Sequence, residues 1–158
     1  NNDSQILSIG ACEFDAEGIV SNTFYNAIRL KDNEHVKTTP STLEFWASQG
    51  NGLSKLLADS NRKPMCEVLL RLSTHFNWED ARIWANGTKF DISMLESVYK
   101  SNDLAPWKYN ADRCMRTLKE FAGKIDVSFE GTKHHALDDA IWQAKYVAAA
   151  CKKLGLVL

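Results

Sequence analysis

The spacing of hydrophobic and polar residues predicts strands in the first thirty residues of the chain. Residues 5–14 are mostly apolar and rich in β-forming side chains, residues 15–18 (DAEG) have turn chemistry, and residues 20–30 resume an extended pattern. Two extended runs joined by a short polar turn are typical of a β-hairpin. We therefore expect a hairpin here.

Helices are predicted where apolar residues recur at spacings of three and four. The pattern is clearest between Leu137 and Leu154, where one apolar stripe predicts a long helix. Shorter helices are predicted over residues 39–46, 64–75, 90–99 and 117–122, with Gly50 and Gly52 ending the first. Short strands are predicted at 81–85 and 109–115. A hairpin followed by alternating strands and helices indicates a single α/β domain whose mixed sheet is covered by helices.

Composition narrows the class of protein. The chain has 158 residues, 44% of them hydrophobic and 25% charged, and carries a formal net charge of −1, as expected of one compact soluble domain. No apolar run is long enough to span a membrane, and the first residues lack the features of a signal peptide, so a cytoplasmic protein is predicted. The four cysteines form no CxxC pair, which makes buried free thiols the expectation. The near-neutral charge argues against extended duplex binding but allows an enzyme that grips a few nucleotides.

The segment HHALDDA at 134–140 concentrates two imidazoles and two carboxylates at the start of the long predicted helix. A structural interpretation exists, because aspartates at a helix N-terminus complement its dipole and a histidine there can cap or pack. On a helical wheel, Asp138 and Asp139 lie on opposite flanks of the apolar stripe, at equal angular distance from its centre. The wheel therefore does not distinguish between them.

A second candidate is the segment NGTKFD at 86–91, in which Asp91 follows a glycine-containing turn after an apolar strand. Ligands in α/β sheets bind beyond the carboxyl ends of strands, so Asp91 is well placed for a site. The alternative is that Asp91 only caps the helix that follows. Two aspartates from distant segments, with a histidine near one of them, suggest a site for Mg²⁺ or Mn²⁺, in which the imidazole takes a proton from an attacking water.

The two segments also resemble a known group of enzymes. HHALDDA matches the H-x-A-L-x-D-A signature of the DEDDh 3′–5′ exonucleases, which have a ribonuclease-H-like α/β fold, and GTKFDISML resembles their second motif. ILSIGACEF at 6–14 resembles the second strand of that family. TLEFWASQ at 42–49 and PWKYNADRCMRTL at 106–118 are most similar to the phage exonuclease A and mycobacterial exoribonuclease branch.

The resemblance implies roles for particular residues. His134 would be the general base, Asp139 a direct metal ligand and Asp91 the acidic residue of the second motif, while Asp138 would be a solvent-facing neighbour. The implied reaction is hydrolysis with two Mg²⁺ or Mn²⁺ ions, which releases nucleoside monophosphates from single-stranded 3′ ends. The motifs do not choose between RNA and DNA, although the likeness to the exoribonuclease branch favours RNA.

One part of the family pattern is missing. The D-x-E motif of the first strand should precede Ile6, and Glu13 and Asp15 do not replace it, because ILSIGACEF aligns with the strand that follows the motif. Two of the four metal-binding carboxylates are thus absent from these residues. We expect the native protein to continue upstream with a strand that occupies the middle of the sheet.

Several side chains are candidates for contacts with nucleic acid. The Asn86 amide would approach the terminal nucleotide or serve its turn, Phe90 is expected in the core or a pocket wall, and the Arg116 guanidinium would bind phosphate or form a surface ion pair. Arg113 has the same two interpretations. Among the tryptophans, Trp46 and Trp107 are better candidates for base stacking than the others, although packing is the expected role of each.

Other functions are compatible with the same residues. The principal rival is a catalytically inactive nucleic-acid-binding or interaction domain that keeps the fold, and the second is a nuclease of different polarity. The retention of both His134 and Asp139 argues against an inactive domain. The sequence predicts no membrane partner, is compatible with a homo-oligomer and leaves the oligomeric state open.

Overall fold

The hairpin is present as the hydrophobic pattern predicts. The computed structural model describes residues 6–29, 40–48, 52–104 and 107–158. Strand β1 (Ser8–Phe14) pairs antiparallel with β2 (Val20–Ala27), in a register that sets Ser8 opposite Ala27 and Phe14 opposite Val20. The Asp15 carboxylate accepts the backbone N–H groups of Glu17 and Ile19, both at 2.9 Å, and so holds the turn.

A second pair of strands forms further along the chain. Strand β3 (Ile83–Ala85) runs parallel to β4 (Asp112–Cys114), with Ala85 opposite Cys114. Within the described residues this pair and the hairpin are two separate two-stranded sheets. The prediction of an α/β fold with antiparallel and parallel pairing is confirmed, whereas the strands of the described ranges do not form the expected single mixed sheet.

Six helices complete the described part of the chain. They are α1 (Pro40–Ser48), α2 (Gly52–Leu57), α3 (Met65–His75), α4 (Asp91–Ser101), α5 (Met115–Ala122) and α6 (Ala136–Leu154). All five predicted helices are present, and α5 begins two residues earlier than predicted. Gly52 begins α2 instead of closing the helix before it, because the short apolar run that follows is itself helical. Gly50 lies outside the described residues.

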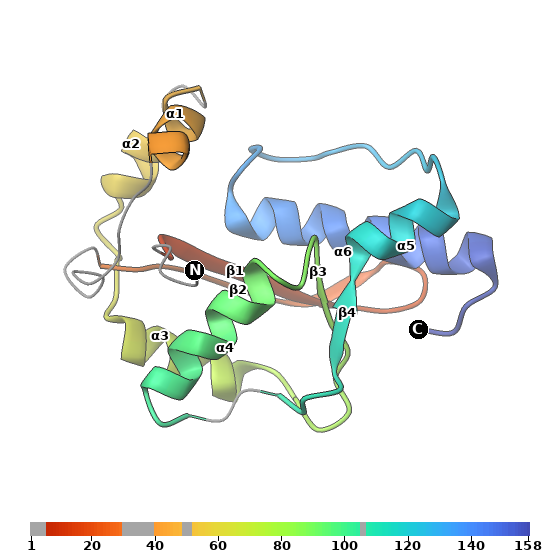
Figure 1. Cartoon of the computed structure of the whole chain (residues 1–158), viewed down its shortest axis with the longest axis horizontal. Coiled ribbons are helices and arrows are strands. Elements are labelled where there is room, and N and C mark those ends of the chain that lie inside the picture. The colour runs from red at the N-terminus through yellow and green to blue at the C-terminus, as the bar shows by residue number, and fades with distance from the viewer. Residues whose placement is uncertain (1–5, 30–39, 49–51, 105–106) are drawn as a thin grey trace.

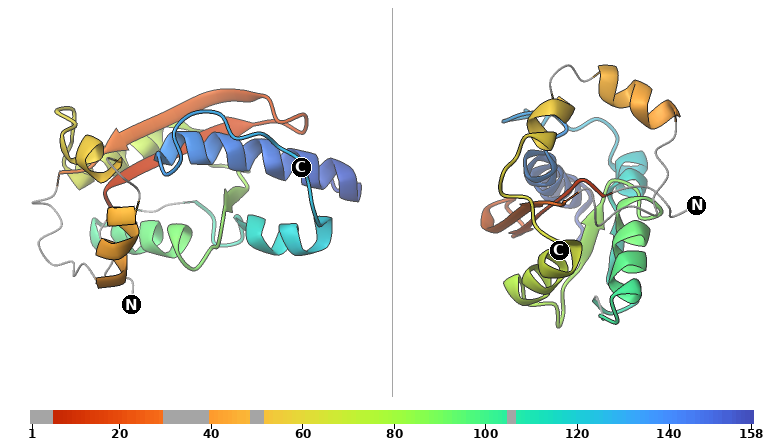
Figure 2. Two further views of the ribbon diagram at one scale, coloured as in Figure 1. Left: turned by 90° about the horizontal axis from the view of Figure 1, so that it is seen from above. Right: turned by 90° about the vertical axis from the view of Figure 1, so that its left-hand side faces the viewer.

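Two hydrophobic clusters hold these elements together. The first joins the inner face of the hairpin to α3 and α4, through side chains that include Phe24, Leu69 and Tyr99. The second joins α5 to α6, through Met115, Val147 and their neighbours. Figure 1 and Figure 2 show α6 running along the hairpin, with α4 and α5 on the side of β3 and β4. The long helix thus links the hairpin to the second pair of strands.

Gly10 sets how closely the start of α6 approaches the hairpin. Ile9 is buried in the first cluster, so the alternation of a strand turns Gly10 to the opposite face, toward α6. A Cβ atom at Gly10 would overlap the backbone of Ala136 and Leu137. Only glycine therefore allows α6 to begin against β1, which places the HHALDDA segment beside the hairpin.

Two further predictions concern the burial of the cysteines and the absence of a membrane-spanning segment. All four cysteines are free thiols, but Cys66 is exposed and only Cys151 is fully buried, so the expectation of buried thiols holds only in part. Among the residues that the structure describes, no helix is both long and apolar enough to cross a membrane.

Candidate active site

The turn before α6 brings His134 and Asp139 together. His134 has a left-handed backbone, with φ of 64°, and its N–H donates to Oδ1 of Asp139 at 3.3 Å. The Asp139 N–H in turn donates to the His135 carbonyl oxygen at 3.0 Å. The Asp139 side chain therefore folds back over the start of the helix toward residue 134. The two residues expected to act as base and ligand are thus adjacent in space.

Asp138 has a different environment from Asp139. Its Oδ2 accepts the N–H of Thr132 at 2.8 Å, and its Oδ1 lies 3.4 Å from Nδ1 of His135. A Cβ atom at Gly131, where φ is 97°, would lie 2.6 Å from the Asp138 carboxylate. The Asp138 side chain is only 27% exposed, so the expectation of a solvent-facing neighbour is wrong. It stabilises the turn before the helix, which is a structural role.

The second candidate segment follows β3. Because β3 and β4 are parallel, the residues after each strand meet at one edge. Nη2 of Arg116 donates to the Asn86 carbonyl oxygen at 3.1 Å. A Cβ atom at Gly87, where φ is 116°, would lie 3.2 Å from the same guanidinium. Arg116 thus contacts the backbone of the NGTKFD turn, and the two interpretations of its guanidinium, phosphate binding and a surface ion pair, stay predictions.

Asp91 is the first residue of α4, directly after this turn. The residue at the N-cap position, Phe90, makes no side-chain hydrogen bond to the helix, whereas the Asp91 carboxylate accepts its own N–H, so the capping interpretation of Asp91 is compatible with the structure. Asp91 lies at the surface, yet the protein atoms around its carboxyl group desolvate it, and this burial raises its pKa. The charge of Arg116 and a hydrogen bond from its own N–H lower the pKa, and the charge of Asp139 raises it.

The charge of Asp139 is the smallest of these effects on the pKa of Asp91, so the two segments lie within range of each other's charge. Burial also raises the pKa of Asp139, against the hydrogen bond from the His134 N–H and the charge of the His134 imidazole, both of which lower it. A cation beside a desolvated carboxylate stabilises its charged form. The arrangement is therefore able to attract a positively charged ligand.

The residue types at this place suit a divalent cation, but within the described residues too few of them lie together. Carboxylate oxygens are the ligands that Mg²⁺ and Mn²⁺ prefer. Within the described ranges, however, no three or more His, Cys, Asp or Glu side chains gather in a way that could hold a metal ion. Asp91 and Asp139 therefore do not by themselves complete a metal site within the described residues.

The other predicted contact residues have mixed outcomes. Phe90 is 60% exposed, so its expected place in the core is wrong, and a place in a pocket wall stays a prediction. It precedes α4 on the outside of the turn, where its ring is available to solvent. The guanidinium of Arg113 donates to the carbonyl oxygens of Asn110 and Asp112, at 2.7 and 2.8 Å, so it serves the local chain. Trp107 is buried and donates its indole N–H to Asp112, which confirms packing.

Two aromatic contacts of this region carry no signal in the sequence. The ring of Tyr25, from β2, stacks on His135 with centroids 4.5 Å apart. The ring of Phe45, from α1, meets the His134 ring edge-on with centroids 5.1 Å apart. Both contacts join segments that are far apart in the chain, so neither periodicity nor motif spacing predicts them.

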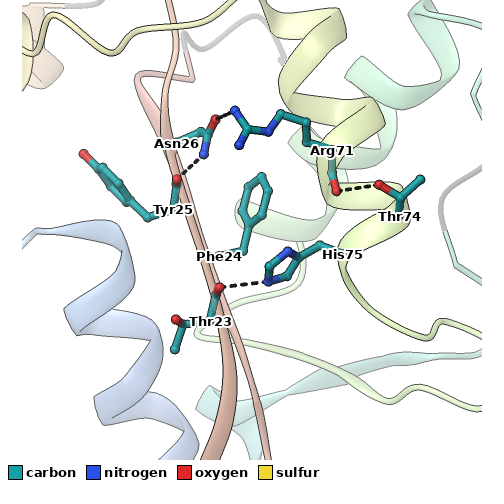
Figure 3. A pocket seen from close by; sticks show the side chains of 7 residues that line it. All are labelled: Thr23, Phe24, Tyr25, Asn26, Arg71, Thr74 and His75. Carbon is teal, nitrogen blue, oxygen red and sulfur yellow. Dashed lines mark hydrogen bonds between the residues drawn. The ribbon is translucent and has the colours of Figure 1, made fainter.

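A groove of about 390 Å³ lies elsewhere, between β2 and α3 (Figure 3). Its lining residues are Thr23, Phe24, Tyr25, Asn26, Arg71, Thr74 and His75. Nε2 of His75 lies 2.8 Å from the Thr23 carbonyl oxygen, and Arg71 donates to the Asn26 side chain at 3.4 Å. These polar groups satisfy one another, and none of the sequence-predicted site residues lines the groove. We therefore assign it to the packing of α3 on the edge of β2.

Cys114 gives a testable prediction near the site. A hydrogen bond with the Thr117 side chain is the main cause that lowers its pKa to about 7, whereas burial raises the pKa of Cys12 to about 11. The thiolate is the reactive form, so Cys114 should alkylate with iodoacetamide far faster than Cys12 at pH 7.5, with a rate that rises through pH 7. Peptide mass spectrometry over a pH series measures both rates. A Cys114 rate that rises only above pH 8.5 would contradict this assignment, and Thr117→Val should move the profile upward.

Comparison with known proteins places these residues in a family. No curated protein and no solved structure matches the chain. A family model, that of the 3′-5′ exoribonuclease Rv2179c-like domain, matches residues 1–151. The match includes both candidate segments and nearly all of α6. The chain therefore belongs to the family of 3′-5′ exoribonuclease Rv2179c-like domains.

Proposed function

We propose that this protein is a divalent-metal-dependent 3′–5′ exonuclease that removes nucleoside monophosphates from single-stranded RNA ends. The observation that carries the proposal is the hydrogen bond that sets His134 beside Asp139, together with the charge of Asp139, which raises the pKa of Asp91. Membership in an exoribonuclease-like family supports this reaction and favours RNA over DNA.

Three side chains have distinct roles in the proposed reaction. The His134 imidazole accepts the proton of a water molecule whose oxygen attacks the terminal phosphorus, and the bond from phosphorus to the 3′ oxygen breaks. The negative charge of Asp139 favours the imidazolium that forms. Asp91 and Asp139 would hold the cations, which when bound would polarise the phosphate and stabilise the departing 3′ oxygen. The departing oxygen takes a proton from solvent, and the monophosphate leaves.

Arg116 is proposed to contact the phosphate chain. Its guanidinium lies at the NGTKFD turn, and its positive charge lowers the pKa of Asp91. The Asn86 carbonyl holds it at that place. A guanidinium binds phosphate oxygens in a bidentate manner, so Arg116 is suited to orient the terminal phosphodiester. Asn86 and the exposed Phe90 flank the same turn and are proposed to contact the terminal nucleotide.

The remaining ligands are proposed to come from a strand that carries the D-x-E motif between β1 and β3. Within the described residues, β1 pairs only with β2 and β3 only with β4. Side chains of β1 and β3 nevertheless enter the same hydrophobic clusters. A strand hydrogen-bonded to both would unite the two sheets into one mixed sheet and add two carboxylates beside Asp91 and Asp139.

The proposal is tested with full-length protein and single-stranded oligonucleotides labelled at either end. With Mn²⁺ present, RNA labelled at its 3′ end should release labelled monophosphate at once, whereas RNA labelled at its 5′ end should shorten stepwise. EDTA should abolish turnover, and added Mg²⁺ or Mn²⁺ should restore it.

Each other outcome points to a named rival. Release from the 5′ end would assign a nuclease of different polarity. Binding of RNA without turnover, at every metal concentration, would assign an inactive binding domain. Faster turnover of DNA than of RNA would overturn the choice of substrate and leave the reaction unchanged.

A further inference from the structure

We propose that Phe45 is a positioning residue, which holds the His134 imidazole in its working orientation. The inference rests on the proposed function, in which His134 accepts a proton. The Phe45 and His134 rings have centroids 5.1 Å apart and planes at 85°, an edge-to-face contact. Aromatic rings favour this arrangement, because the positive edge of one ring meets the negative face of the other.

The His134 side chain has few other restraints. Its backbone is held, because the N–H donates to Asp139, but this bond leaves both side-chain torsions free. His134 is exposed, and among the described residues no hydrogen bond engages either nitrogen of its ring. A general base must hold a fixed direction toward the water that it deprotonates. The Phe45 ring supplies a contact that selects one ring orientation.

The placement of Phe45 fits this role better than a role in the core. Its side chain is 43% exposed, although it is large and apolar, and it belongs to neither hydrophobic cluster. The ring contacts Trp46 of the same helix, with centroids 5.4 Å apart. Helix α1 lies at the end of the molecule where α6 begins (Figure 1; Figure 2). Phe45 thus reaches the site from a separate segment.

The kinetic test compares Phe45→Leu with a matched control. Phe121→Leu removes a ring that is 74% exposed near the end of α5, away from His134. Phe45→Leu should lower kcat about tenfold with little change in KM, since a misdirected base slows the chemical step. Phe45→Tyr, which keeps the ring, should retain kcat, and Phe121→Leu should match the parent protein.

A second measurement does not depend on activity. The chain has four histidines, so the ring protons of His134 can be assigned in NMR spectra by their loss in His134→Ala. Phe45→Leu should shift these resonances, because they lose the ring current of the neighbouring aromatic, whereas Phe121→Leu should leave them unchanged. The melting temperature of each variant establishes that it folds.

The outcomes separate this inference from the proposed function. Unchanged His134 resonances and unchanged kcat in Phe45→Leu would overturn the positioning role. A raised KM with unchanged kcat would overturn it as well, and would assign Phe45 to the binding of a base. If instead His134→Ala retains full activity, the proposed function fails, while the NMR measurement still decides whether Phe45 orients the ring.

Discussion

Replacement of His134 is expected to lower 3′-end hydrolysis by at least about 100-fold, the usual contribution of a positioned general base. His134 is exposed, and its link to Asp139 uses the backbone N–H, so removal of the imidazole leaves the fold and the carboxylate in place. We expect the loss in kcat rather than in KM, because the imidazole acts on the water and not on the bound RNA.

The choice of variant matters at this position. With φ of 64°, residue 134 occupies a region that alanine tolerates poorly and asparagine tolerates better. His134→Asn therefore separates the loss of the base from a change in backbone, and His134→Ala should give the same kinetic result. Lys133→Ala, at the exposed neighbouring position, serves as a control that should keep most activity. Retention of more than half of the activity by His134→Asn would exclude His134 as the base.

Asp139→Asn is expected to abolish turnover and to weaken Mn²⁺ binding, whereas Asp138→Asn should keep most of the activity. The Asp139 carboxylate accepts the His134 N–H and its charge raises the pKa of Asp91, whereas the Asp138 carboxylate accepts the Thr132 N–H. Loss of one of the few carboxylate ligands should lower activity by at least about 100-fold, because a bound metal ion stabilises the charge that develops in the transition state. Mn²⁺ titration followed by calorimetry checks the binding directly. Equal losses in the two variants would overturn the assignment of Asp139 over Asp138.

Stability should change in the opposite direction from activity. Burial raises the pKa of Asp139 in the folded protein, so the folded state favours the protonated carboxyl group more than the unfolded state does. The stability that this group contributes is present below its unfolded pKa and is lost as the pH rises through the folded pKa. At pH 7, without metal, Asp139→Asn should therefore melt at a higher temperature than the parent protein. The difference should disappear near pH 3, which thermal melts over a pH series would measure.

Elements with strong local patterns could be predicted from the sequence alone. The hairpin is specified by two extended runs and the Asp15 turn, and α6 by an apolar stripe, so their places follow from residues two to four positions apart. Helix α2 was not predicted, because it is a single short run that begins at a glycine. The separation into two sheets could not be predicted either, since strand pairing depends on neighbours from distant parts of the chain.

The candidate site likewise has features that the residue types predict and features that depend on the tertiary structure. The residue types of HHALDDA and NGTKFD indicated carboxylate and imidazole chemistry, and the family match agrees with the reaction class that they suggested. The helical wheel left Asp138 and Asp139 equivalent. The turn at Gly131 distinguishes them, because it directs the Thr132 N–H onto Asp138 and leaves Asp139 beside His134. The exposure of Phe90 was also beyond a pattern that records only its apolar character.

By itself, the sequence determined which segments become strands or helices and which residues carry reactive groups, because both properties depend on near neighbours and on side-chain chemistry. Only the tertiary structure decided which of those groups meet. The approach of α6 to Gly10, the reach of Arg116 to the NGTKFD turn and the contact of Phe45 with His134 all join distant segments. Such contacts arise from the packing of whole elements against one another, and no local periodicity encodes them.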